Sequence, residues 1–206
     1  MKNINQVDKV DMFKLDENVD RRVRADSKRN METLLEAAME VFRTSGVDAP
    51  VREIASKAKL GIGTLYRHFP QRSDLIIAVF QHEVNSCADT AYSLLQRHEP
   101  GDAVALWLQR YASFIEAKIG LATALHSGDP AYETLPAYFR EKLLPALTML
   151  LDRAVETGQI RADVAPSDLL IAVARLCMQS HDEGPEYSRR MVSLLVDGLR
   201  YGTTNP

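Results

Sequence analysis

The chain has 206 residues, 46% of them hydrophobic, which allows one large or two small domains with a substantial core. No stretch approaches the about 18 consecutive apolar residues of a transmembrane helix, and the N-terminus lacks the apolar run of a secretory signal, so we expect a cytoplasmic protein without membrane contact. The formal charge of -3 argues against nucleic-acid binding, but residues 21–80 carry 11 Lys and Arg against 7 Asp and Glu, a local net charge of +4 that suits phosphate contact.

Residues 1–25 are polar and charged without a sustained period, and we expect a flexible tail there. The basic run at the end of this tail contains Arg21, Arg22 and Arg24. Two interpretations of this run remain open. It is either a solvated linker or a basic arm that contacts phosphates or enters the minor groove of DNA.

Three short helical segments follow the tail, over residues 31–42, 51–58 and 63–69. The first ends at Gly46, where glycine can adopt the left-handed conformation, and the second opens at Pro50, because proline suits the start of a helix. Leu60-Gly61 forms the corner between the second and third segments, and Pro70 ends the third. This layout predicts a helix-turn-helix at about residues 50–69.

The third segment has a divided surface. Leu65 and Phe69 lie four residues apart and face the core, whereas the outward residues are Thr64, Arg67 and His68, with Tyr66 at the edge. A short helix with these polar groups suits the major groove of DNA. Arg67 is the strongest candidate for reading a base, because its guanidinium can pair with guanine O6 and N7; the alternatives are a phosphate contact or a solvated side chain.

The segments VREIA (residues 51–55) and GTLYRHF (residues 63–69) resemble the tetracycline-repressor (TetR) family of bacterial transcriptional regulators, over about residues 28–84. The resemblance implies a homodimer that binds double-stranded operator DNA and a second, all-helical half for ligand binding and dimerisation. Residues 107–111 (WLQRY) and 120–125 (GLATAL) also resemble one subgroup, the SbtR-like regulators.

The resemblance also implies that Tyr66, His68 and Arg72 contact backbone phosphates, and Arg52 on the second helix can do the same. For His68 a partly buried position at the helix end is the alternative. The predicted DNA-binding residues are Arg52, Thr64, Tyr66, Arg67, His68 and Arg72. One departure from the family is visible, because Ala49 and Pro50 stand where relatives carry a Thr or Ser that caps the second helix and touches phosphate.

Helical patterns also fill the remaining chain. A long helix capped by Ser73 links the two halves, and further helices are expected over residues 103–118, 121–125, 135–157, 169–178 and 187–201. Pro145 lies inside one of them and should bend or break it. No segment alternates with a period of two, so the predicted fold class is all-α: a three-helix DNA-binding domain over residues 26–84, then a helical bundle over residues 85–206.

Aromatic and polarizable residues in the second half suggest a cavity for a small apolar or aromatic effector, because bundle interiors commonly host such sites. The candidates for this effector pocket are Trp107, Tyr111, Phe114, His126, Met149 and Cys177. Ordinary core packing is the alternative interpretation for most of them.

The last two helices are broadly apolar, and in TetR relatives such helices pair with those of a second subunit. The candidates for this dimer interface are Leu169, Val173, Leu176, Val192, Leu195 and Leu199. Packing within their own subunit is the alternative. A two-fold dimer suits the function, because the recognition helices of two DNA-binding domains (here called reading heads) must reach half-sites about 34–36 Å apart or a multiple of that spacing.

We therefore expect a transcriptional repressor that a small molecule releases from DNA; the alternative is an activator, or a ligand-binding protein of the same fold without repressor activity. No enzyme, metal site or cofactor is predicted, because Gly61-Ile62-Gly63 is too short for a dinucleotide fingerprint and the histidines are scattered. Cys87 and Cys177 belong to no metal-binding or redox motif, and we expect buried reduced thiols, with a redox sensor as the alternative.

Overall fold

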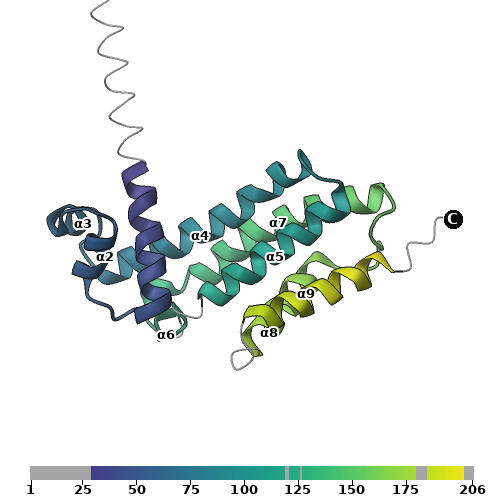
Figure 1. The fold of residues 1–206 in the computed structure, drawn as a ribbon. Helices are drawn as coiled ribbons and strands as arrows, with labels where there is room; N and C mark the ends of the chain where they lie inside the picture. The colour runs from purple at the N-terminus through teal and green to yellow at the C-terminus, as the bar shows by residue number, and fades with distance from the viewer. Residues whose placement is uncertain (1–28, 119–120, 126, 180–184, 202–206) are drawn as a thin grey trace, which may run out of the picture.

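The computed structural model describes residues 29–118, 121–125, 127–179 and 185–201, and its regular elements within these ranges are all helical (Figure 1). The first helix covers residues 29–45, and the elements after it are α2 (Val51–Lys57), α3 (Ile62–His68), α4 (Arg72–Leu95), α5 (Pro100–Lys118), α6 (Ala122–Leu125), the 3-10 helix η2 (Pro130–Tyr132), α7 (Leu135–Glu156), α8 (Pro166–Gln179) and α9 (Pro185–Arg200). The predicted all-α class is confirmed. None of the described helices combines the length and hydrophobicity that crossing a membrane requires.

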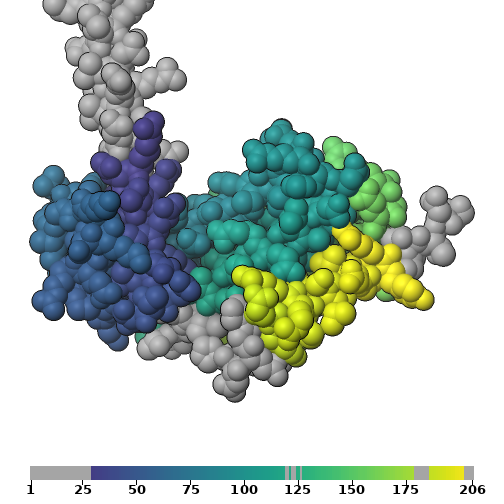
Figure 2. Space-filling view, viewed as in Figure 1, coloured from purple at the N-terminus to yellow at the C-terminus, as the bar shows by residue number. Residues whose placement is uncertain are grey.

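The first helix, α2 and α3 form one end of the molecule, and α4 leads from this end into the larger helical body (Figures 1 and 2). Within that body α4 packs along α5 and α7, and α5 also packs against α8 and α9. Figure 1 shows α8 and α9 together on one side of the body, away from α3. The predicted link between the two halves is therefore one continuous helix.

The small N-terminal core follows from the apolar period of the first helix. Leu34, Ala38 and Phe42 of that helix are buried, as are Ile54 of α2 and Leu65 of α3. The burial of one face of each helix is the main stabilising contribution to such a small unit.

Glycine ends the first helix as predicted. The backbone of Gly46 has a φ of 76°, and its N–H donates to the Phe42 carbonyl at 3.0 Å. This left-handed residue satisfies one of the carbonyls that a helix end leaves free.

The turn between α2 and α3 differs in one detail from the predicted corner at Leu60-Gly61. The left-handed residue is Lys59, with a φ of 55°, whereas Gly61 has an extended backbone. The Leu60 N–H donates to the Ala55 carbonyl at 2.9 Å. This hydrogen bond, which closes the end of α2, requires a left-handed backbone at residue 59, and that residue is a lysine in this chain.

The start of α4 corrects the predicted cap at Ser73. The N-cap residue is Gln71, whose backbone N–H donates to the carboxylate of Asp74 at 2.9 Å, and the two residues form a capping box. Ser73 lies inside the first turn, two residues after the N-cap position.

Arg72 was predicted to contact a DNA phosphate, but its side chain forms hydrogen bonds within the protein. Its half-buried guanidinium donates to the backbone carbonyls of Val47 and Ala49, the latter at 2.6 Å, and lies 5.9 Å from the ring centre of Phe42. The side chain therefore ties the start of α4 to the segment between the first helix and α2. We assign it this structural role and leave it out of the DNA surface proposed below.

We expect Arg72→Ala to lower the free energy of unfolding by about 1–3 kcal/mol, because two partly buried carbonyls lose their donor. Arg72→Lys should recover only part of this loss, since an ammonium lacks the planar fork of the guanidinium. Urea denaturation followed by circular dichroism measures the effect. The control is Arg97→Ala at an exposed position, for which a change within about 0.5 kcal/mol is expected; an equal change for both alanine variants would contradict the role of Arg72.

The proline inside α7 does not break the helix, which runs without interruption from Leu135 to Glu156. Pro145 is exposed, and so is Glu141, whose carbonyl would have accepted the missing backbone hydrogen bond. The opposite side of the helix keeps its buried contacts through Leu143, Leu147 and Leu150. Water can serve the free carbonyl on one side while the packing on the other side holds the helix together.

Candidate DNA-binding surface and effector cavity

The surface of α3 is divided as the sequence pattern predicts. Leu65 is only 1% exposed and Phe69 is also buried, whereas Tyr66 is 51% exposed. Arg67 and His68 are exposed and Thr64 is half-buried, so the partly buried alternative for His68 does not hold. The buried pair anchors the helix and leaves a hydroxyphenyl, a guanidinium and an imidazole free to meet a partner.

The neighbouring helix α2 adds Arg52, which is exposed, and Lys57, whose ammonium lies 3.8 Å from the carboxylate of Glu40. Pro50 is its N-cap residue and makes no side-chain capping bond, as the departure from the family pattern implies. The Glu53 N–H donates instead to the Pro50 carbonyl at 2.9 Å, so the helix begins without help from a hydroxyl side chain.

The aromatic residues predicted for the effector pocket form part of the core instead. Trp107, Tyr111 and Phe114 of α5 are fully buried, with ring centres 5.7 and 6.3 Å apart along the series. The Trp107 indole N–H donates to the Cys87 carbonyl at 2.9 Å, and the Tyr111 hydroxyl donates to the Leu170 carbonyl at 3.2 Å. Their polar atoms are thus already paired, as burial requires.

Of the other three pocket candidates, two lie outside the cavity lining and the third is not described by the structure. Cys177 is buried away from the cavity described next, Met149 is half-buried outside it, and His126 lies outside the described residues. Burial raises the pKa of the Cys177 thiol to about 11 and that of Cys87 to about 12. Neither cysteine is in a disulfide, and both thiols remain protonated at neutral pH, which argues against the redox-sensor alternative.

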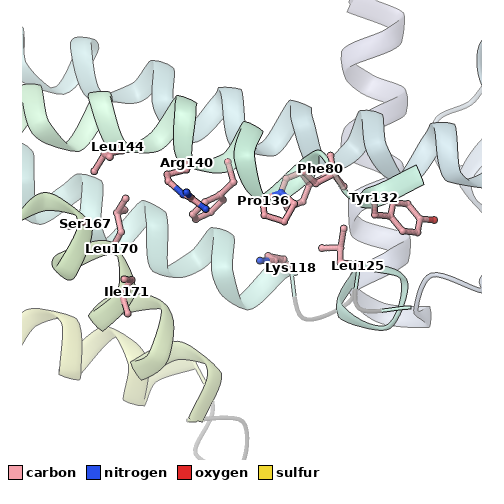
Figure 3. A pocket seen from close by; sticks show the side chains of 12 residues that line it. Phe80, Lys118, Leu125, Tyr132, Pro136, Arg140, Leu144, Ser167, Leu170 and Ile171 are labelled. Atoms are coloured by element: carbon pink, nitrogen blue, oxygen red, sulfur yellow. The ribbon is translucent and has the colours of Figure 1, made fainter. Parts of the chain in front are cut away.

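A cavity of about 520 Å³ lies between the helices of the larger body, at a place the sequence did not indicate (Figure 3). Its lining comes from α4 to α8 and consists of Phe80, Lys118, Leu125, Tyr132, Leu135, Pro136, Phe139, Arg140, Leu144, Ser167, Leu170 and Ile171. Phe139 contacts the rings of Tyr111 and Phe114 at centre distances of 6.1 and 6.0 Å, so the buried aromatic residues support the cavity wall from behind. Its size and apolar lining suit a small organic molecule.

For most of the predicted dimer-interface residues the structure favours the alternative, packing within their own subunit. Leu169, Val173, Val192 and Leu199 are buried inside their own subunit, and Leu176 and Leu195 are half-buried. The outward apolar side chains of α8 and α9 are instead Ile171, Met178 and Leu194, of which the last two are each 62% exposed. The sequence prediction selected the most apolar positions of these two helices for the interface, and such positions pack mainly in the core of their own subunit.

The charges of α2 and α3 and the order of the helices define a class of protein: a helix-turn-helix DNA-binding regulator with a helical second domain. Among the described residues, no three His, Cys, Asp or Glu side chains are grouped so that they could hold a metal ion. Residues 34–79 match the model of the family described as bacterial regulatory proteins, tetR family, and residues 99–201 match that of the SbtR-like transcriptional regulator C-terminal domain. The chain belongs to the TetR family of transcriptional regulators.

Crystal structures of two relatives agree with this assignment. A TetR transcriptional regulator from Streptomyces coelicolor is 35% identical, with 82% of this chain and 98% of that chain covered and a TM-score of 0.73. A TetR regulatory protein from Mycobacterium vanbaalenii is 33% identical, with 86% and 99% covered and a TM-score of 0.67. An HTH-type transcriptional regulator of Staphylococcus aureus is 38% identical over 64 residues, which span 31% of this chain and 35% of the relative.

Proposed function

We propose that this protein is a homodimeric transcriptional repressor that leaves its operator when a small molecule fills the cavity between α4, α5, α7 and α8. The observation that carries the proposal is the surface of α3, where Tyr66, Arg67 and His68 are exposed above the buried Leu65. A helix of this kind presents its polar face to the major groove. Binding to chromosomal DNA makes the cytoplasm its site of action.

In this proposal the DNA-binding domain covers residues 26–84, and residues 85–206 form the effector and dimerisation domain. Arg67 reads a base, while Arg52, Tyr66 and His68 contact phosphates and Thr64 contacts a phosphate or a thymine methyl. Phosphate contacts fix the register of the protein on DNA, and base contacts give the sequence preference.

The dimer is proposed to form through the exposed faces of α8 and α9, where Met178 and Leu194 offer apolar area to a second copy. A two-fold axis presents two α3 helices to a palindromic operator, with half-sites about 34–36 Å apart or a multiple of that spacing. A monomer would meet only one half-site.

The path from the cavity to DNA is proposed to run through the N-terminal part of α4 and through η2. Phe80 of α4 lines the cavity, and so does Tyr132 of η2. Burial raises the pKa of the Tyr132 hydroxyl and the charge of Arg72 opposes this rise, so the two side chains are within electrostatic reach. Arg72 holds the segment before α2, and a shift of Tyr132 or α4 would therefore reach the reading head.

For release the effector must discriminate between two arrangements of the reading heads. A change from mostly bound to mostly released requires that the effector prefer the released arrangement by about 5 kcal/mol. A ligand that binds both arrangements equally would leave DNA affinity unchanged.

The test is a gel-shift titration with DNA from upstream of the protein's own gene against a random duplex of equal length at the same salt. We expect at least about a thousandfold preference for the upstream DNA, as specific regulators achieve. Equal affinity for both duplexes would contradict the proposal. A reporter gene under the same promoter then separates repression from the alternative, activation, by the direction of its response.

A further inference from the structure

The effector cavity combines an apolar wall with positive charge. Two of its lining side chains are cationic, Lys118 and Arg140, and none is acidic. Arg140 is exposed and contributes its charge where the cavity meets solvent, whereas Lys118 is half-buried at the end of α5. In Figure 3 these two residues lie in the middle of the lining, between Tyr132 at one end and Leu144 at the other.

Lys118 has only aromatic neighbours for its charge within the described part of the chain. Its ammonium lies 5.8 Å from the ring centre of Phe80 and 5.5 Å from that of Phe139, and no described carboxylate forms an ion pair with it. Burial lowers the pKa of Lys118 below its ordinary value. Its positive charge is therefore incompletely compensated, since ring faces replace only part of the lost hydration.

We infer that the cavity binds an amphipathic organic anion, whose carboxylate or phosphate head group pairs with Lys118 while its apolar body lies along Phe80, Phe139 and Leu170. An anion supplies the missing partner at the point where water is already displaced, and such charge-assisted hydrogen bonds are among the strongest in proteins. Arg140 adds attraction at the entrance. The inference deepens the proposed function, because it gives the chemical class of the proposed effector.

Ligands of other charge fit this cavity less well. A neutral apolar molecule would cover the Lys118 ammonium without giving it a partner, and so would increase the desolvation of that charge. A cationic ligand would place a like charge beside Lys118 with no acidic side chain in the lining to offset it.

The test is isothermal titration calorimetry of the full chain without DNA, with decanoate below its micelle concentration and decan-1-ol below its solubility limit. These probes share one chain length and differ in the charge of the head group. We expect decanoate to bind about ten- to a hundredfold more tightly than decan-1-ol. Equal affinities in the wild-type protein, or binding of neither probe, would overturn the inference whether or not any variant folds.

Lys118→Gln should remove this preference by weakening decanoate about ten- to a hundredfold, with decan-1-ol changed by less than about threefold. Lys142→Gln is the matched control, because Lys142 also lies over an aromatic ring, that of Tyr138 at 5.7 Å, but is exposed and outside the cavity lining. A preference that survives in Lys118→Gln, or is lost equally in Lys142→Gln, contradicts the assignment.

Two further probes define the head group and the body. A preference for decyl phosphate over decan-1-ol supports the same site with a phosphate head group, whereas acetate or inorganic phosphate binding as tightly as the long-chain anions would contradict an amphipathic ligand. Gel-shift release by decanoate is measured separately. Tight decanoate binding without release would support the anion site and contradict the proposed effector response.

Discussion

Arg67→Ala is expected to remove most or all of the preference for operator DNA while leaving the fold and the proposed dimer intact. The side chain is exposed on α3 and makes no described hydrogen bond, so its removal opens no cavity in the protein. A bidentate contact with guanine contributes about 1–3 kcal/mol for each subunit, and a symmetric dimer makes it twice. The two contacts together contribute about 2–6 kcal/mol, so operator affinity should fall by about thirtyfold to ten-thousandfold in a gel-shift titration, with the melting temperature unchanged.

The random duplex distinguishes base reading from phosphate contact. If Arg67 reads a base, its loss weakens operator binding and leaves non-specific binding almost unchanged. If it contacts a phosphate, both affinities fall together and the salt dependence of binding becomes shallower by about one ion per contact. Arg97→Ala is the control of equal charge at an exposed position remote from α3, and it should change neither affinity.

The helices could be read from the sequence because their causes are local. Glycine ends α7 as predicted, since Gly158 has a φ of 66° after a run with apolar residues three and four apart. The errors fall where two local signals compete. Gln71 rather than Ser73 caps α4, because the acceptor that completes the capping box, Asp74, lies three residues after the glutamine.

The proposed DNA surface was equally accessible to sequence reasoning, because Leu65 and Phe69 define the inner side of α3 by spacing alone. The cavity was not accessible, because it depends on which helices face one another. Large aromatic residues such as Trp107 mark a core as readily as a pocket. One signal for the cavity was available in the sequence. Lys118 is a cation that follows the apolar residues Phe114 and Ile115 by four and three positions, and the structure buries both of these residues.

The outward apolar residues of α8 and α9 were missed for a similar reason. Leu194 and Leu195 are adjacent in the chain and lie about 100° apart around the helix, so one can pack against the core while the other faces outward. Leu195 packs against the core and Leu194 is exposed. An apolar residue next to a core position is therefore better evidence for an interface than the core position itself.

The double variant Met178→Glu, Leu194→Glu is expected to convert the proposed dimer into a folded monomer. Both side chains are largely exposed on the single subunit, so glutamate at these positions is solvated in the monomer and loses that solvation only in an interface. Analytical ultracentrifugation measures the assembly and circular dichroism measures the fold. The control is Tyr92→Glu at an exposed aromatic residue of α4, a helix that packs on α5 and α7, and it should leave the assembly unchanged.

The same double variant should lose more operator affinity than a variant that lacks a single DNA-contacting side chain. In a dimer the second α3 binds as an intramolecular event, which raises the overall affinity by a factor of about 10²–10⁴ over one head alone. The monomer keeps Arg67 and every other residue of its reading head, so its residual affinity measures a single half-site. An unchanged dimer, or a monomer with full operator affinity, would show that α8 and α9 do not join the two heads; a fall of two to four orders of magnitude is the result that a two-fold repressor requires.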